Sequence, residues 1–324
     1  MLCTSDRLSI DKRKRTLAAM TTHALPSARF APSADLALLL VAACWGASYG
    51  MAQGALAHYP VLGFLAVRFL LTAAVLAPAC RRAHRAQWAA ALGAGLPLGA
   101  LLMAIFVCET YGVAHTPAGR AALLISLCVV FTPFAEWLLL RRRPAPAVFG
   151  FAAVSLAGAA LLTGGWPSQW AVDGLGWGRG EWLMLAAAGL RAVMVCVTSR
   201  LTRCHAEAST LHLTAVQAGV VGLGCLGWAA ATQGGLPPLP RAPAFWGATL
   251  FLVLGCTVLA FAVQNWALRQ HSPSRVSLLM GTEPVWGALF ATLWLGETLG
   301  SAGWLGGALI VASTLWLTGR KGRG

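Results

Sequence analysis

The sequence has little charge for its length. Charged residues make up 10% of the 324 positions, and only ten of them are acidic, whereas an ordinary soluble domain has about 25% charged residues. Hydrophobic residues make up 58%. A soluble protein of this length could not bury so much apolar surface, so the composition excludes an ordinary soluble fold.

Motifs of several chemical functions are also missing. There is no Gly-x-x-x-x-Gly-Lys-Ser/Thr, which disfavours direct use of ATP by this chain alone. The nine cysteines form no Cys-x-x-Cys and most lie in apolar runs, where free cysteine behaves as a small hydrophobic residue. We therefore predict no disulfide, no metal site and no cofactor. Because no carboxylates are closely spaced and no His/Asp motif occurs, we predict no catalytic residues and no enzyme.

Long apolar runs are the dominant feature of the chain. Each is close to the roughly 20 residues that a helix needs to cross a bilayer core, and within lipid a helix satisfies its own backbone hydrogen bonds. We predict an all-α integral membrane protein with ten transmembrane helices, which makes the lipid bilayer a partner. The ten runs are 36–57, 61–79, 88–108, 118–140, 146–163, 181–198, 210–231, 244–263, 274–295 and 300–318.

The net charge of +14 is unevenly distributed along the chain. Basic residues gather in the N-terminal tail, at the C-terminal end and in alternate loops, for example at 81–85, 141–143 and 200–203, whereas each remaining loop holds at most one. This distribution follows the positive-inside rule. It predicts a multi-pass protein of the inner (cytoplasmic) membrane with both termini cytoplasmic, and it argues against a nucleic-acid partner.

One stretch of the sequence occurs twice. Residues 109–164 align with residues 264–319 without a gap, twelve of the fifty-six paired positions are identical, and Arg120 falls on Arg275. Each half then holds five apolar runs. An odd number makes the second half enter the membrane from the opposite side, which predicts two inverted five-helix repeats. We also predict one central cavity lined by runs one, three, four, six, eight and nine, with runs five and ten at the periphery.

The composition at the edges of these repeats predicts the division of the chain. The N-terminal residues are polar and basic, and the stretch between the halves is rich in glycine and tryptophan, as suits a loop at a membrane interface. The predicted division is a disordered basic cytoplasmic tail at 1–34, a first repeat at 35–164, an extracytoplasmic linker at 165–180, a second repeat at 181–319 and a basic cytoplasmic tail at 320–324.

Short motifs in both halves resemble those of a known family. They are Cys44-Trp45-Gly46-Ala47-Ser48, Arg68-Phe69-Leu70, Gln264-Asn265-Trp266-Ala267-Leu268, Ser272-Pro273-Ser274-Arg275, Glu283-Pro284-Val285 and Leu295-Gly296-Glu297. Over about residues 35–319 the chain resembles the drug/metabolite transporter superfamily, EamA-like branch. The resemblance implies ten helices in two inverted repeats and transport of small metabolites. The first half departs from the pattern, because Cys128-Val129 stands where the second half has Glu283-Pro284.

Ionisable residues inside the apolar runs are functional candidates, because they are costly in lipid. Arg191 is the strongest candidate, because it lies near mid-depth, too far from either surface for its side chain to reach. We predict that it faces a cavity or a carboxylate, with Glu283 as its partner. Such a pair either binds solute or only locks two helices together.

The other ionisable residues have simpler interpretations. Arg68 is expected to hold helices together through a neighbouring carbonyl, and Glu136 to reach the cytoplasmic interface beside the arginines at 141–143. Glu109 is either an interfacial carboxylate or a cavity residue. Together with aromatic residues on the cavity runs, these considerations predict a substrate-binding set of Arg191, Glu283, Trp45, Tyr49, Glu109, Tyr111, Trp266 and Asn265.

The predicted function is secondary transport of a small molecule by alternating access. An anionic or zwitterionic solute could compete for Arg191, so the expectation is an exporter of amino-acid-like or organic-anion solutes across the cytoplasmic membrane. Two alternatives are a non-transporting scaffold or sensor and an intramembrane enzyme acting on a lipid-linked substrate. A homodimer is left open.

Overall fold

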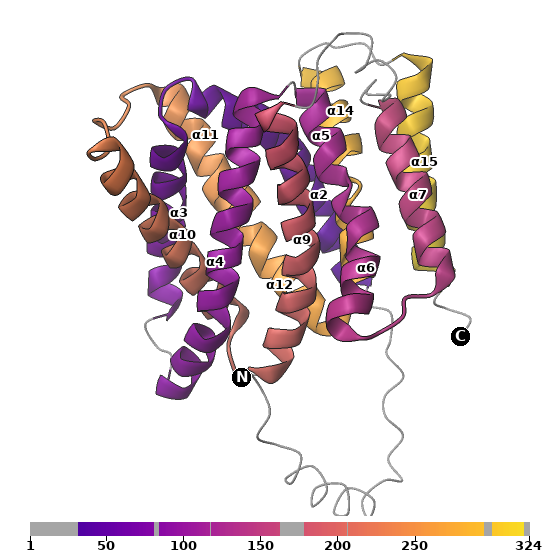
Figure 1. Ribbon diagram of the computed structural model, residues 1–324, viewed down its shortest axis with the longest axis horizontal. Coiled ribbons are helices and arrows are strands. Elements are labelled where there is room, and N and C mark those ends of the chain that lie inside the picture. Colours follow the sequence, from indigo (N-terminus) through magenta and orange to yellow (C-terminus); the bar gives the residue numbers. More distant parts are fainter. Residues whose placement is uncertain are drawn as a thin grey trace, which may run out of the picture.

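The computed structural model describes residues 32–80, 84–116, 118–162, 178–205, 207–294 and 300–320, and nearly all of them are helical. The helices run side by side in one bundle (Figure 1). Those of the first repeat are α2 (Pro32–Leu56), α3 (Val61–Cys80), α4 (Arg85–His115), α5 (Ala118–Ser126), α6 (Cys128–Leu140) and α7 (Pro146–Leu162). Those of the second are α9 (Arg179–Cys204), α10 (Thr210–Gln233), α11 (Pro243–Val253), η1 (Leu254–Leu259), α12 (Ala260–Gln270), α13 (Pro273–Met280), α14 (Glu283–Trp294) and α15 (Ser301–Arg320).

The helices suit a membrane in length and in surface. Seven spans within the described residues are long and apolar enough to cross a bilayer, while α7 and the apolar part of α15 are shorter and α13 and α14 divide one predicted run. Large apolar side chains point outward, with Leu138 80%, Leu223 64% and Trp316 62% exposed. Exposed apolar surface on this scale marks contact with a membrane or a partner. The protein is an all-α, multi-pass membrane protein.

Local sequence explains where several helices begin and end. Pro243 and Pro273 occupy the first turns of α11 and α13, where a missing backbone N–H costs nothing. The Ser272 hydroxyl accepts a hydrogen bond from the backbone N–H of Arg275 at 3.4 Å and caps α13. Gly234 ends α10 with a φ of 69°, in the left-handed region where glycine is favoured.

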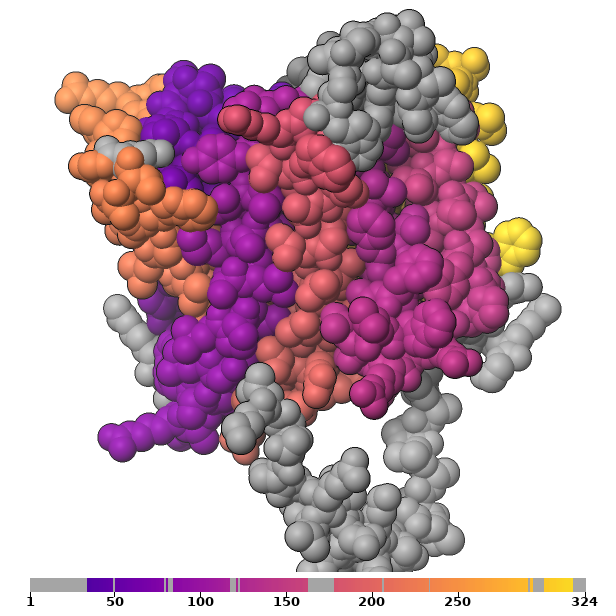
Figure 2. All heavy atoms as spheres, viewed as in Figure 1, coloured from indigo at the N-terminus to yellow at the C-terminus, as the bar shows by residue number. Residues whose placement is uncertain are grey.

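Helices that correspond in the two repeats pack in a corresponding way. Second helices α3 and α10 lie against each other, and so do the last helices α7 and α15. The contact of α4 with α9 is matched by that of α11 with α2, and the contact of α6 with α9 by that of α14 with α2. Figure 2 shows α10, α4, α9, α6 and α7 next to one another across one face. As predicted, α7 and α15 lie at one edge of the bundle (Figure 1).

The fourth span of each repeat is interrupted at the same place. Leu127 separates α5 from α6, and Gly281 and Thr282 separate α13 from α14. Leu127 is aligned with Thr282 in the repeat register. The two breaks also lie close together, because a Cβ atom added to Gly281 would come within 2.5 Å of Cγ2 of Val129. Interrupted membrane helices commonly border binding sites, because backbone groups are freed there.

Glycines at two helix contacts let the backbones approach closely. A Cβ atom on Gly46 of α2 would lie 2.5 Å from the backbone nitrogen of Gly287 in α14, and one on Gly158 of α7 would lie 2.7 Å from the carbonyl oxygen of Gly306 in α15. Small residues of this kind let membrane helices pack backbone to backbone. The first contact brings the start of α14 against α2, and this contact helps to place Glu283.

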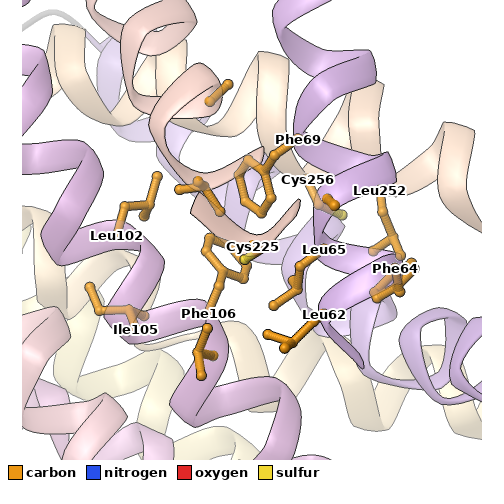
Figure 3. Close-up of a cluster of buried hydrophobic side chains, with 14 of the residues drawn as sticks. Leu62, Phe64, Leu65, Phe69, Leu102, Ile105, Phe106, Cys225, Leu252 and Cys256 are labelled. Carbon is orange, nitrogen blue, oxygen red and sulfur yellow. The ribbon is translucent and has the colours of Figure 1, made fainter. Parts of the chain in front are cut away.

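An apolar core joins α3, α4, α10, α11 and η1 (Figure 3). Phe69 and Phe106 meet edge to face with ring centroids 4.8 Å apart, and Phe106 continues to Phe261 at 6.1 Å. This core packs beside the centre of the bundle and fixes Phe106, which also borders the site described below. Aromatic pairs in this arrangement contribute about 0.5–1.5 kcal/mol beyond the area they bury.

Polar contacts join the two repeats near the start of α13. Arg275 pairs with Asp35 of α2, with Nη2 and Oδ2 2.5 Å apart. The Glu136 carboxylate accepts hydrogen bonds from the backbone N–H of Ser274 at 3.2 Å and from the Ser274 hydroxyl. Glu136 is only 6% exposed. The prediction that it reaches the interface beside the arginines is therefore wrong, because the start of α13 supplies donors for the carboxylate inside the bundle.

Some predicted segments lie mainly outside the described residues. These are the tail at 1–34, of which 32–34 begin α2, the linker at 165–180, of which 178–180 lead into α9, and the tail at 320–324, of which Arg320 ends α15. The side chains of Tyr49 and Arg120 are likewise outside the description.

Candidate functional site

A central cavity of about 60 Å³ lies where the two repeats meet. Its lining comes from α2, α4, α5, α6, α9, α12, α13 and α14. These are runs one, three, four, six, eight and nine, so the predicted set of cavity-lining spans is confirmed. The walls are largely apolar. Polar lining side chains are Ser126, Arg191, Gln264, Ser277 and Glu283.

Arg191 is the centre of an ion-pair cluster at this cavity. It occupies the middle of α9, and its Nη2 atom lies 2.9 and 2.8 Å from the two carboxylate oxygens of Glu109 on α4. Its Nη1 atom lies 3.4 Å from Oε2 of Glu283, the first residue of α14. The three side chains are 17%, 12% and 9% exposed. The sequence predicted Glu283 as the partner of Arg191, whereas the shorter contacts are to Glu109.

Trp45 covers one face of this cluster. The Arg191 guanidinium carbon lies 5.0 Å from the centroid of the Trp45 ring, within the range of a cation–π interaction. The indole N–H donates to the carbonyl oxygen of Cys256 at 2.9 Å, and Phe261 meets the ring edge to face at 6.0 Å. The indole is thus fixed from both sides, and it holds the guanidinium in a defined place between the carboxylates.

Corresponding positions of the two repeats surround the cavity, but one member of each polar pair carries a charge. Arg191 corresponds to Trp45, ten residues after the acidic starts of α9 and α2. Phe106 and Phe261 also correspond, and both line the cavity. The remaining pairs are Glu109 with Gln264 and Glu283 with Cys128, and all four side chains border this cavity or the next one.

A second, smaller cavity of about 30 Å³ lies on the other side of Arg191. Arg191, Trp45 and Phe106 line both cavities and therefore separate them. The second cavity extends toward the C-terminal ends of α2 and α4, and Glu109 lines it there. The ion-pair cluster thus stands between two spaces rather than inside a packed core.

Arg68 also lines the second cavity. Its Nε and Nη2 atoms donate to the Thr257 hydroxyl at 3.1 and 3.0 Å, and its guanidinium carbon lies 5.0 Å from the centroid of the Phe106 ring. Arg68 therefore ties α3 to η1, as predicted, but through a hydroxyl rather than a carbonyl. It also contributes a second guanidinium to the wall of the cavity.

Other predicted site residues lie away from the cavities. Asn265 is 2% exposed and donates to Thr214 and Gln217 of α10. Trp266 packs against a core cluster on another side of α12, and Tyr111 against the core of Figure 3. Neither cavity is lined by these three. The substrate set missed Gln264, Ser277 and Cys128, although the repeat alignment already paired Gln264 with Glu109 and Cys128 with Glu283.

Two observations bear on catalysis and metal binding. Among the residues that the structure describes, no group of three or more His, Cys, Asp or Glu side chains could hold a metal ion. The sequence from Gly46 to Gly50 reads Gly-x-Ser-x-Gly, but it lies inside the continuous helix α2, and Ser48 donates to the carbonyl oxygen of Trp45 at 2.7 Å. A nucleophile elbow needs a sharp turn between a strand and a helix, and this segment does not provide one.

Comparisons with known proteins agree with the two-repeat architecture. The model of the EamA-like transporter family matches residues 32–164 and again residues 178–319. A "Probable terminal-alkyne amino-acid exporter" from Streptantibioticus cattleyicolor is 27% identical over 296 residues, which cover 88% of this chain and 93% of the relative. A solved structure described as "Crystal structure of protein" superposes with a TM-score of 0.67 at 20% identity, over 90% of this chain and 99% of the other. That likeness concerns the fold alone.

Proposed function

Because this chain belongs to the EamA-like transporter family, we propose that it is a secondary transporter that exports small amino-acid-like solutes across the cytoplasmic membrane by alternating access. The observation that carries the proposal is the cluster of Arg191, Glu109 and Glu283 at the boundary between two cavities. Charged groups at this depth are costly unless they are compensated. A compensated cluster that borders free space can exchange partners with a solute.

The balance of charge in the cluster favours a zwitterion. One guanidinium faces two carboxylates, so the cluster attracts an ammonium group as well as a carboxylate. A solute carboxylate would take Arg191, while its ammonium group would take Glu283 or Glu109. The relative that is described as an amino-acid exporter supports the same class.

The rest of the cavity suits an apolar side chain. Leu102, Ile105, Met194, Phe261 and Met280 supply most of the wall facing the polar groups. Apolar walls with a few placed polar groups are the usual make-up of a small-molecule site. We therefore infer that amino acids with apolar side chains are better solutes than polar ones.

Exchange of ion-pair partners offers the solute a route past the cluster of Arg191, Glu109 and Glu283. Breaking a buried ion pair by removing one partner is costly, because a charge is left uncompensated. A zwitterion can place its own carboxylate on Arg191 and its ammonium group on the glutamate that it displaces. Every charge then stays compensated. Arg191 can then pass the solute from one cavity to the other without an unpaired intermediate.

Alternating access rests on ten helices in two inverted five-helix repeats. Two observations support this arrangement: corresponding helices make corresponding contacts, and the fourth spans break at aligned positions. With both termini cytoplasmic, the cavity toward the ends of α2 and α4 opens outward. Reporter fusions after Arg143 should read cytoplasmic and fusions within 168–176 external, and a cytoplasmic reading at 168–176 would contradict the inversion.

The test of the solute class is counterflow in proteoliposomes loaded with an unlabelled apolar amino acid. We expect uptake of the labelled amino acid, with competition by other apolar amino acids. The matching amine, which lacks the carboxylate, and the matching deaminated acid should compete poorly. Equal competition by the deaminated acid would point to organic anions instead. Absence of flux for amino acids and anions alike, from folded protein, would favour the scaffold or sensor.

A further inference from the structure

A basic cleft lies between the C-terminal ends of α6 and α9, away from the central cavity. Its volume is about 520 Å³, within the range of roughly 300–1,000 Å³ typical of ligand sites. The two helices pack side by side, and both end at the same edge of the bundle (Figure 1). The lining residues are Leu139, Leu140, Arg141, Arg142, Ser199, Arg200, Arg203 and Cys204.

Arginine dominates the polar lining of the cleft. Arg141 and Arg142 follow α6, and Arg200 and Arg203 lie in the last turns of α9. Among the described residues, none of these four side chains forms an ion pair. Basic residues suit helix C-termini, but that preference does not require four of them around one cavity. Four guanidinium groups around a shared space favour an anion with more than one charged oxygen, such as a phosphate ester.

The arginines of the cleft are not repeated in the other half of the sequence. In the repeat register, Arg200 and Arg203 fall on Gly54 and Ala57, and Arg142 falls on Glu297. The corresponding positions therefore hold no arginine. By the positive-inside rule the basic face is cytoplasmic, and the cytoplasmic leaflet is the one that presents anionic lipids.

Apolar surface leads from the cleft onto the lipid-facing side of α6. Leu139 lines the cleft, and next to it Leu138 is 80%, Phe134 51% and Trp137 47% exposed. The Arg143 guanidinium carbon lies 5.5 Å from the Trp137 ring centroid. Tryptophan and arginine side by side are typical of the headgroup level of a membrane. A soluble phosphate would use only the arginines, whereas a lipid would use both surfaces.

We propose that this cleft binds the phosphate headgroup of an anionic phospholipid, with the acyl chains along α6. The test is native mass spectrometry of the detergent-purified, full-length protein with added tetraoleoyl cardiolipin, and with phosphatidylcholine as the neutral comparison. The variant Arg142→Gln/Arg203→Gln removes one arginine from each helix. We expect it to lower the apparent affinity for cardiolipin by about tenfold or more, since each basic residue near a charged membrane contributes about 1 kcal/mol.

The matched control is Arg82→Gln/Arg85→Gln, in the basic segment that leads from α3 into α4. It removes the same charge without touching the arginines or the tryptophan around the cleft. We expect its affinity for cardiolipin to stay within about twofold of the unmodified protein, because long-range charge alone is weakly felt beyond a Debye length. Equal losses of cardiolipin affinity in the two double-glutamine variants would overturn the proposal. They would mean that diffuse basic charge, and not the cleft, binds the lipid.

Two further arms complete the test. Inorganic phosphate should displace the lipid poorly, and displacement at low millimolar phosphate would identify a soluble-phosphate site instead. The variant Arg142→Lys/Arg203→Lys keeps the charge of the cleft and provides a second test if the glutamine variant misfolds. Its affinity for cardiolipin should fall by an intermediate amount, because lysine lacks the planar guanidinium fork. Binding of phosphatidylcholine as tight as that of cardiolipin would also overturn the proposal. Solute flux is not the readout, so the result is independent of the transport proposal.

Discussion

The two repeats place corresponding residues around the two adjoining cavities, yet they differ in charge at each polar position. The first repeat supplies Trp45, Glu109 and Cys128, and the second supplies Arg191, Gln264 and Glu283 at the same places. The shell is therefore nearly symmetric, whereas the charge is not. In the proposed transport cycle, the symmetric shell opens toward either side by equivalent movements, and the asymmetric set of charges gives the solute one preferred orientation.

The largest effect is expected from removing the one guanidinium of the cluster. Arg191→Ala should abolish solute exchange, because Glu109 and Glu283 are left without their common partner. Arg191→Lys should weaken apparent affinity by roughly tenfold to a hundredfold, since hydrogen bonds to charged groups contribute about 1.5–3 kcal/mol. Counterflow in proteoliposomes measures both.

A variant with an uncharged cluster distinguishes a role in solute binding from a role in holding the helices together. Arg191→Met combined with Glu109→Gln and Glu283→Gln removes all charge, so we expect it to express and fold better than Arg191→Met alone, yet not to transport. Restored transport in this variant would show that the cluster only locks helices. Normal flux in a well-expressed Arg191→Ala protein would contradict the proposed role directly.

An intermediate effect is expected from moving a carboxylate between repeats. Glu283→Cys should lower flux by about tenfold or more through the loss of a charged partner. Adding Cys128→Glu returns the carboxylate to the corresponding position on the other side of the same cavity, so part of the flux should return. Cys128→Glu alone is the control. A double variant no better than Glu283→Cys would mean that the two sides of the cavity are not interchangeable.

A smaller effect on transport is expected at Glu136, which has no part in either cavity. Glu136→Gln weakens the hydrogen bonds to Ser274 and should destabilise the fold by about 1.5–3 kcal/mol. Thermal unfolding in detergent should detect this loss, while apparent solute affinity of the folded fraction stays unchanged. A changed affinity at equal stability would place Glu136 in the transport mechanism.

The smallest effect is expected at Asn265. Its amide bonds to Thr214 and Gln217 join α12 to α10 outside the cavity. Asn265→Ala should cost about 1 kcal/mol of stability and leave solute affinity within about twofold. Gln264→Ala, one residue earlier and in the cavity wall, should lower affinity more. The opposite ranking would return Asn265 to the substrate site that the sequence predicts.

The sequence predicted most of the helical spans and the place of Arg191 in the middle of its helix, because apolar length and repeat register are local properties. It also predicted which spans line the cavity. It did not predict how each helix is rotated about its axis, so Asn265 and Trp266 were assigned to the site although Gln264 and Phe261 face it. Neighbouring positions on a helix differ by about 100°. The roles of Glu109 and Glu136 depended on long-range partners, Arg191 and Ser274, that no local pattern reveals.

The π-helical turn η1 is a place in the eighth span where one residue can be removed without reorienting the side chains at the cavity. A π-helical turn holds one residue more than the α-helix it interrupts, so a deletion within Leu254–Leu259 would restore a regular helix and leave Phe261 and Gln264 facing as before. A deletion in α12 would turn every later side chain by about 100°. Deleting Thr257 itself would in addition remove the hydroxyl that donates to the carbonyl oxygen of Leu252 and accepts a hydrogen bond from Arg68. The π-helical turn thus carries a hydroxyl that serves the arginine beside the second cavity, while the phase of the helix beyond it is preserved.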